Sequence, residues 1–226
     1  MLTLNSVSFR WPGNPQTCID RLSLTLAPQE WAALTGNNGA GKSTLLRLMA
    51  GLLTPTQGTI SLSGQPLAAL KNRQRAAFIG VLFQEAEQQI FHSRVEDEVA
   101  FGLRLQKLPA HEVKRRTADA LALCELTNVA NAHPLDLHSA QRRMVAVASL
   151  EALAPPFLLL DEPSRDFDDR WLAVFERWLN ACRARGTTLL AISHDYDFVE
   201  RHFSRVLRLQ EGNIDADGPP ETVLRR

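Results

Sequence analysis

Apolar and polar positions alternate over Leu2–Phe9 and Leu22–Leu26, which is typical of strands that expose one face to water. Between about residues 93 and 154 the apolar positions follow a helical spacing, and strand patterns become rare. Shorter, mostly apolar runs predict further strands at Trp31–Thr35, Gly58–Leu62, Phe78–Phe83, Phe157–Leu160 and Thr187–Ile192. The pattern therefore predicts an α/β fold whose core is interrupted by a helical insertion.

Helix boundaries support this division of the chain. A helix is predicted over roughly Arg170–Arg185, and Gly186 stands just past it, where a C-terminal glycine commonly ends a helix. Pro109 is predicted to start another helix, because proline suits the first helical position. We find no repeat and no linker, so we expect one domain. Its parts are an α/β core at about 1–84 and 155–226 and a helical subdomain at about 85–154.

Composition limits the classes of protein to which the chain can belong. Lys plus Arg and Asp plus Glu each number 25, so the chain has no net field that would attract nucleic acid. Cys18, Cys124 and Cys182 are scattered without metal-ligand spacing, as in proteins of a reducing compartment. The N-terminal residues lack a signal-peptide pattern, and a glutamate and two prolines interrupt the most apolar stretch, Met144–Leu160. We therefore expect a cytoplasmic protein that reaches a membrane only through a partner.

The most informative segment joins a predicted strand to a predicted helix. It fits G-x-x-x-x-G-K-[ST], the phosphate-binding loop known as the Walker A motif. The candidate nucleotide-binding residues of this loop are Gly36, Asn37, Asn38, Gly39, Ala40, Gly41, Lys42, Ser43 and Thr44. The glycines let backbone N–H groups converge on phosphate oxygens, and the helix N-terminus adds partial positive charge. We expect Lys42 to reach the β- and γ-phosphates of a nucleoside triphosphate and Ser43 to complete a Mg²⁺ shell.

A second candidate catalytic group stands at the end of the apolar strand Phe157–Leu160. Asp161 and Glu162 follow this strand directly, and ligands of open α/β sheets bind at the carboxyl ends of the strands. We expect Asp161 to hold Mg²⁺ and Glu162 to polarise the attacking water as a general base. A hydrophobic run followed by Asp-Glu is a weak pattern alone, but the phosphate-binding loop upstream strengthens it.

Four more positions, in the right order, make the chain resemble the ATP-binding subunits of ATP-binding cassette (ABC) transporters over essentially its whole length. Gln84 lies where this family has its Q-loop glutamine, and His194 in Ile-Ser-His-Asp resembles the switch histidine. Trp11 matches the aromatic residue that stacks on adenine, and Asp168 matches the D-loop aspartate. The resemblance implies a P-loop NTPase core of the ABC type with an N-terminal antiparallel β-subdomain and a helical insertion. It also implies ATP hydrolysis with Mg²⁺, in which His194 donates to the γ-phosphate and Gln84 contacts Mg²⁺ or the attacking water.

A narrower resemblance lies in residues 83–102, which are similar to the Q-loop region of energy-coupling factor (ECF) ATPases of vitamin, cobalt and nickel importers. Glu85–Gln89 replaces the Asn-Pro-Asp-Asp-Gln stretch of that class, so the match is partial. It implies a pair of ATPases docked on a membrane T-component, with a separate substrate-binding S-component. The chain would then be peripheral, on the cytoplasmic face of the inner or plasma membrane. An ATPase of another ABC importer or of an exporter is the alternative.

The family signature Leu-Ser-Gly-Gly-Gln is altered in this chain. The aligned residues are Leu137, His138, Ser139, Ala140 and Gln141. In a head-to-tail dimer of the family, the signature closes over ATP held by the other subunit, and its glycines permit a close backbone approach. We expect the added Cβ atoms of Ser139 and Ala140 to crowd the γ-phosphate, although His138 or Ser139 could still donate to it. We therefore predict pairing with a second, non-identical ATPase; an ordinary homodimer is the alternative.

Two other classes of function also use a phosphate-binding loop. Soluble ABC-type ATPases of translation or DNA repair usually carry two cassettes or long coiled-coil insertions, neither of which we expect in 226 residues. A regulator that binds nucleotide without turnover would not need Lys42, Glu162 and His194 together. We therefore expect a transport-coupled ATP hydrolase.

Overall fold

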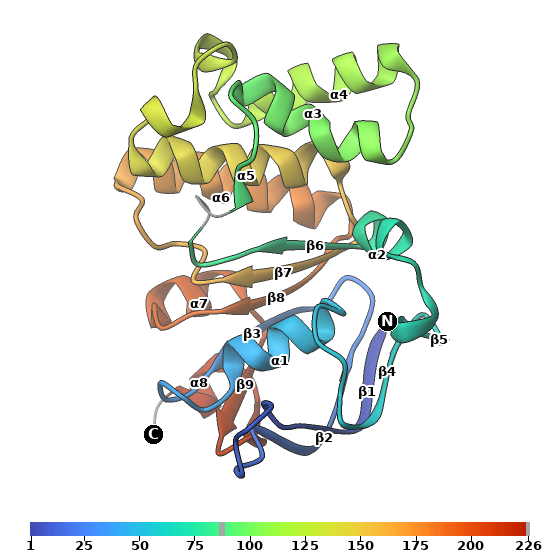
Figure 1. Ribbon diagram of the computed structural model, residues 1–226. Coiled ribbons are helices and arrows are strands. Elements are labelled where there is room, and N and C mark those ends of the chain that lie inside the picture. Colours follow the sequence, from blue (N-terminus) through green and yellow to red (C-terminus); the bar gives the residue numbers. More distant parts are fainter. Residues whose placement is uncertain (86–88, 225–226) are drawn as a thin grey trace.

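The computed structural model describes residues 1–85 and 89–224, and within these ranges the strands form two sheets (Figure 1). The smaller sheet is antiparallel, with strand order β2-β1-β4-β5. Its strands are β1 (Leu2–Phe9), β2 (Ile19–Leu26), β4 (Gln57–Leu62) and β5 (Gln65–Pro66). The predicted alternation is present in β2, where Leu22, Leu24 and Leu26 are buried and the residues between them are exposed.

The larger sheet has the strand order β10-β9-β3-β8-β7-β6 in the described ranges. Neighbouring strands pair in parallel from β9 through β3, β8 and β7 to β6, and β10 is antiparallel to β9. The strands are β3 (Trp31–Thr35), β6 (Ile79–Leu82), β7 (Phe157–Asp161), β8 (Thr188–Ile192), β9 (Arg205–Gln210) and β10 (Asn213–Gly218). Every residue of β3, β7 and β8 is buried, as expected for parallel strands covered on both faces.

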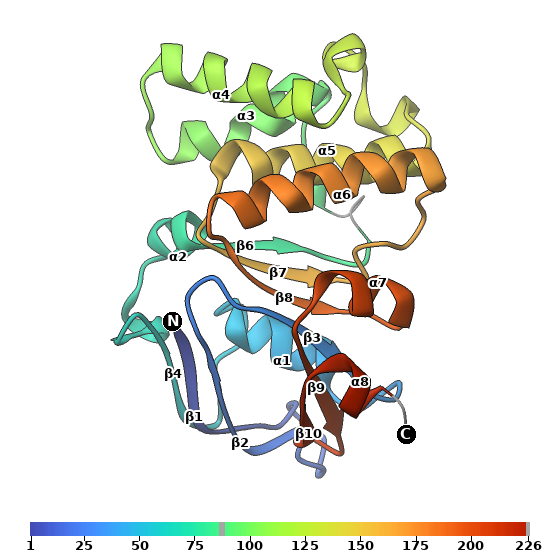
Figure 2. The same cartoon turned by 180° about the vertical axis from the view of Figure 1, so that it is seen from behind.

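Helices cover the larger sheet, and α3, α4, α5 and α6 form the upper layer of Figure 1. The α-helices are α1 (Lys42–Met49), α2 (Asn72–Phe78), α3 (Val95–Leu105), α4 (Ala110–Leu123), α5 (Ser139–Leu153), α6 (Asp169–Ala184), α7 (Tyr196–His202) and α8 (Pro220–Val223). Short 3₁₀ turns are η1 (Leu67–Ala69), η3 (Thr127–Val129) and η4 (Pro134–Asp136). Seen from behind, α5 and α6 lie between the sheet and the outer helices α3 and α4 (Figure 2). None of the helices in the described ranges combines the length and hydropathy needed to cross a bilayer.

The alternating side chains of the parallel strands divide the interior into two hydrophobic cores. Leu158 and Leu160 of β7 pack into the core that contains α5 and α6. Phe157 and Leu159 pack on the other face, with α1 and the smaller sheet. The carboxyl end of β7 is thereby held between two well-packed layers, which fixes the position of the residues that follow it.

The predicted fold class is confirmed: the chain has the α/β core, the N-terminal antiparallel sheet and the inserted helices. Gly186 also has the predicted role, because it follows α6 with a left-handed φ of 74°. The strand predicted over Phe78–Phe83 is shorter in the structure, since Phe78 ends α2 and β6 covers Ile79–Leu82. The strands β9 and β10 and the helix α7 were not predicted.

Candidate functional site

The phosphate-binding loop runs from the end of β3 to the start of α1. Gly36 leaves the strand with φ at 137°, a conformation that favours glycine. A Cβ atom added at Gly36 would lie 2.2 Å from the carbonyl oxygen of Leu209 in the neighbouring strand β9. The larger sheet therefore requires glycine at the point where the loop begins.

Lys42 is the first residue of α1, and its side chain is buried among the groups of the loop. Its Nζ donates to the carbonyl oxygens of Gly36, at 2.7 Å, and Asn37, at 2.9 Å. Burial lowers the pKa of Lys42, while the nearby Glu162 and Asp161 carboxylates act to raise it. Because no side chain caps the N-terminus of α1, its first N–H groups and this ammonium form a site that suits an anion.

Asp161 ends β7 directly opposite the start of α1. The Ser43 hydroxyl donates to Asp161 Oδ2 at 3.1 Å, and burial raises the pKa of Asp161. A hydroxyl and a carboxylate at this separation are hard oxygen ligands of the kind that Mg²⁺ takes. No cluster of three or more His, Cys, Asp or Glu side chains in the described residues forms a protein cage for a metal. The pair therefore suits Mg²⁺, which keeps waters and substrate phosphates as its other ligands.

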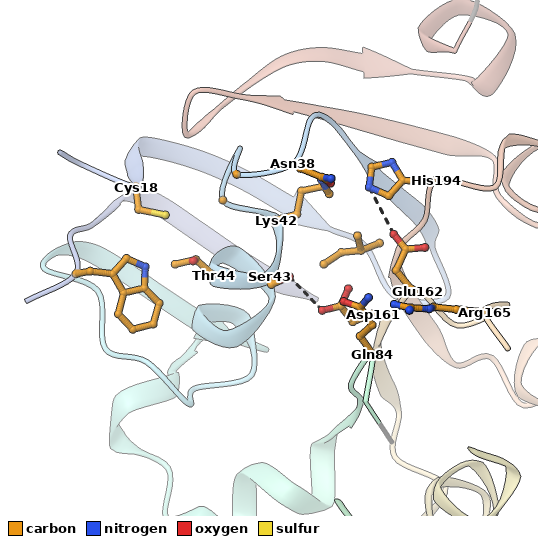
Figure 3. A pocket seen from close by; sticks show the side chains of 14 residues that line it. Cys18, Asn38, Lys42, Ser43, Thr44, Gln84, Asp161, Glu162, Arg165 and His194 are labelled. Atoms are coloured by element: carbon orange, nitrogen blue, oxygen red, sulfur yellow. Dashed lines mark hydrogen bonds and ion pairs between the residues drawn. The ribbon is translucent and has the colours of Figure 1, made fainter. Parts of the chain in front are cut away.

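Glu162 and His194 lie close together on the loops that follow β7 and β8. His194 Nε2 is 3.6 Å from Glu162 Oε1, an arrangement that Figure 3 shows beside Asp161 and Gln84. Glu162 has a left-handed backbone, with φ at 48°, and its N–H donates to the Ile192 carbonyl of β8 at 2.9 Å. The conformation is uncommon for a residue with a side chain, and such backbones gather at functional sites.

A cavity of about 560 Å³ unites these groups, which is within the usual range for small-molecule sites. Its lining residues are Trp11, Cys18, Asn38, Gly39, Gly41, Lys42, Ser43, Thr44, Gln84, Asp161, Glu162, Arg165, Ile192 and His194. Figure 3 shows Cys18 at the end of the cavity away from His194 and Glu162. Trp11 also lines the cavity, and its ring packs edge-on against Phe9 at a centroid distance of 5.1 Å.

Most of the predicted nucleotide-binding residues therefore gather in one cavity, but several lie elsewhere. Gly36, Asn37 and Ala40 belong to the loop without lining the cavity. Asp168 also lies outside it, and its Oδ1 caps α6 by accepting from the Trp171 N–H at 2.9 Å. Residues 86–88 of the ECF-like stretch Glu85–Gln89 fall outside the described residues.

The altered signature also lies outside this cavity, at the N-terminus of α5. His138 is the N-cap, and its Nδ1 accepts from the Gln141 N–H at 3.4 Å. Ser139 is exposed, whereas Ala140 is 5% exposed and its side chain belongs to the hydrophobic core. The Ala140 side chain therefore packs inward in this chain, and the crowding of a partner's phosphate by the altered signature stays a prediction. Ser139 carries the added Cβ that faces outward.

Three residues that line the cavity were not predicted from the sequence: Cys18, Arg165 and Ile192. Cys18 lies against the loop, since a Cβ added at Gly41 would be 3.4 Å from its Sγ. Arg165 brings a guanidinium to the side of the cavity that holds Glu162 (Figure 3). The sequence signal that could have indicated Arg165 is its position three residues after Glu162, the predicted general base.

Comparison with known proteins identifies the family. The family model described as ABC transporter matches residues 19–165, which is more than half of the chain. The chain therefore belongs to the ABC transporter family, and it is an ATP-binding, ATP-hydrolysing domain of that family.

Individual relatives agree with this assignment. The energy-coupling factor transporter ATP-binding protein EcfA1 of Enterococcus faecalis is 32% identical, over 99% of this chain and 81% of EcfA1. The solved structure of cbiO1 from Clostridium perfringens, described as part of the ABC transporter complex cbiONQ, is 26% identical with a TM-score of 0.86. The match covers 99% of this chain and 90% of cbiO1. A putative ABC transporter ATP-binding protein of Bifidobacterium longum, BL0043, is 31% identical over the whole chain, which spans about a third (33%) of that relative.

Proposed function

We propose that this chain is the ATPase subunit that powers a membrane transporter, and that the transporter is an ECF-type importer of a vitamin or of cobalt or nickel ions. The observation that carries the proposal is the cavity, which brings together the phosphate-binding loop, the Ser43–Asp161 pair and the Glu162–His194 pair. The similarity to proteins named EcfA1 and to cbiO1 supports the ECF class. An ATPase of another ABC importer or of an exporter is the second candidate, because the family model that matches residues 19–165 describes ABC transporters in general.

Binding of ATP follows from the loop geometry. Lys42 Nζ now satisfies two loop carbonyls, and phosphate oxygens would replace these acceptors as the β- and γ-phosphates enter. Trp11 would stack on the adenine ring at its end of the cavity. Ser43, Asp161 and Gln84 would hold Mg²⁺, which when bound neutralises charge on the phosphate oxygens.

Hydrolysis uses the residues that follow β7 and β8. Glu162 would accept a proton from the attacking water, and its pinned backbone N–H keeps the carboxylate beside His194. His194 would donate a hydrogen bond to the γ-phosphate without adding a permanent charge. The chemistry is mostly positioning and charge stabilisation, as in other phosphoryl transfers.

The partners are a second ATPase subunit and integral membrane subunits, which would hold the chain at the cytoplasmic face of the membrane. Asp168 would lie at the ATPase–ATPase contact, and the His138–Gln141 segment would close over the partner's nucleotide. The altered signature favours a non-identical partner with an intact one. In the assembled transporter, restoring the signature with His138→Ser, Ser139→Gly and Ala140→Gly should raise turnover at the partner's site alone. Unchanged turnover, or a rise at the site of Lys42, would contradict the asymmetric arrangement.

Purification of the tagged chain from detergent-solubilised membranes tests the proposal as a whole. We expect a second, different ATPase, a membrane T-component and a small S-component to co-purify, each identified by mass spectrometry. A complex with two six-helix membrane subunits and no small substrate-binding membrane protein would contradict the ECF class while leaving the ATPase assignment intact.

A further inference from the structure

Arg143 lies in α5, two residues after the altered signature, and its side chain is buried with 3% exposure. Its guanidinium donates to the carbonyl oxygens of Gln84 and Glu162, both at 2.7 Å. Longer hydrogen bonds reach the carbonyl oxygens of Asp161, at 3.3 Å, and Pro163, at 3.4 Å. A single side chain of the helical layer thus holds the backbone of two segments that carry predicted catalytic residues, those of Gln84 and Glu162.

Burying the Arg143 guanidinium costs free energy, and its hydrogen-bond partners indicate what the residue does. Desolvation lowers the pKa of Arg143, and the hydrogen bonds it makes with the described residues go to backbone carbonyls. Removing a charged group from water is expensive, and a buried apolar side chain would avoid this expense. The planar fork of arginine, unlike lysine or an apolar residue, can span several carbonyls at once. The residue therefore suits the task of fixing these carbonyls relative to one another.

The backbone of Glu162 depends most on the contact with Arg143. Its left-handed backbone is held on one side by the hydrogen bond from its N–H to Ile192 and on the other by Arg143 at its carbonyl. Loss of the second hydrogen bond would let the peptide rotate toward a more common conformation. The carboxylate, now 3.6 Å from His194, would move with it.

We propose that Arg143 is a positioning residue for ATP hydrolysis: it locks the backbone of Glu162 to that of Gln84 and ties both to the signature helix α5. The inference rests on the proposed role of Glu162 as general base. Movement of α5 on closure with a partner subunit would then act directly on the Glu162 peptide. Arg143 does not line the cavity, so we assign it a positioning role and no direct contact with the nucleotide that this chain would hold.

The next residue in the chain supplies a matched control. Arg142 also lies in α5 and also donates to backbone carbonyls, those of Pro134, Leu135 and Leu137. These carbonyls belong to the turn before α5, up to the first residue of the altered signature, and not to the segments of Gln84 and Glu162. Substitution of Arg142 therefore removes hydrogen bonds of the same kind without releasing Glu162 or Gln84.

The test compares R143M with R142M in the full chain, with turnover expressed per bound nucleotide so that misfolded protein is not counted. We expect R143M to lower kcat by about tenfold or more, because small misplacements of catalytic groups are costly, with ATP affinity within about twofold of wild type. R142M should keep kcat within about twofold. Wild-type kcat in R143M, or an equal loss in R142M, would overturn the inference.

Two further variants keep the result decisive. R143K retains one cation that reaches fewer carbonyls, so we expect a kcat between those of wild type and R143M. If R143M fails to fold, a wild-type kcat in R143K overturns the inference and a kcat at least about threefold lower supports it. E162Q separates the two proposals. Substantial turnover in E162Q would refute the assignment of Glu162 as the general base. An inactive E162Q beside a fully active R143M would refute only the positioning role of Arg143.

Discussion

Replacing Gly36 with alanine should displace the start of the phosphate-binding loop. The added Cβ would lie 2.2 Å from the carbonyl oxygen of Leu209 and 3.1 Å from its carbonyl carbon. Normal contact requires the two strands to separate there by about 1 Å. The Gly36 carbonyl also accepts from Lys42 Nζ at 2.7 Å, so the displacement changes the anion site as well as the sheet.

The structure gives the size of the effect and a control. The unfavourable φ of 137° costs alanine about 1–3 kcal/mol, and the overpacking adds about 1–3 kcal/mol. Gly39→Ala shares the first cost but not the second, because no described atom lies within 4 Å of a Cβ added at Gly39, whose φ is 82°. We therefore expect Gly36→Ala to lower the free energy of unfolding by about 1–3 kcal/mol more than Gly39→Ala does.

Urea denaturation of both variants, followed by intrinsic tryptophan fluorescence, measures this difference. Titration with a fluorescent ATP analogue should show weaker binding for Gly36→Ala than for wild type, since the carbonyl that positions Lys42 has moved. Equal unfolding free energies for the two alanine variants would refute the steric argument at the strand β9.

Two more predictions concern the nucleotide cavity. Lys42→Ala should weaken ATP binding by roughly tenfold or more, because it removes the cation from the anion site; calorimetric titration checks this, and wild-type affinity would contradict it. Burial raises the pKa of Cys182 to about 12 and also raises the pKa of Cys124, so both thiols stay protonated near neutral pH and react slowly. Maleimide should therefore label Cys18 first, and saturating ATP should slow that labelling because Cys18 lines the cavity. Peptide mass spectrometry measures the labelling of each cysteine. Faster labelling of Cys124 or Cys182, or labelling of Cys18 that ATP does not slow, would contradict this prediction.

The parts of the site that are contiguous in sequence were predictable. The phosphate-binding loop and the Asp161–Glu162 pair at the end of β7 each combine local chemistry with a local strand pattern, and both contribute residues to the lining of the cavity. The contacts of Arg143 were not predictable, because they join α5 to Gln84, 59 positions away, and to the segment after β7. The orientation of Ala140 is likewise set by how α5 packs in the core, so its burial could not be read from the signature alone.

The last two strands were missed for a related reason. Arg205 and Arg208 interrupt the apolar pattern of β9 and suggest an exposed segment. In the structure Arg205 pairs with Asp217 of β10 at 2.7 Å, and Arg208 pairs with Asp215 at 2.8 Å. Cross-strand ion pairs satisfy these charges beside a buried strand, and such pairing appears only when the partner strand is known.

The most direct test of the catalytic site is ATP hydrolysis by Glu162→Gln measured beside ATP binding. Glutamine keeps the shape and hydrogen bonding of the side chain beside His194 but removes its basicity. We expect steady-state hydrolysis to fall by roughly 100-fold or more, with ATP affinity within about twofold of wild type. A Glu162→Gln protein that hydrolyses ATP at a rate close to wild type would contradict the assignment of this cavity as the site of general-base hydrolysis.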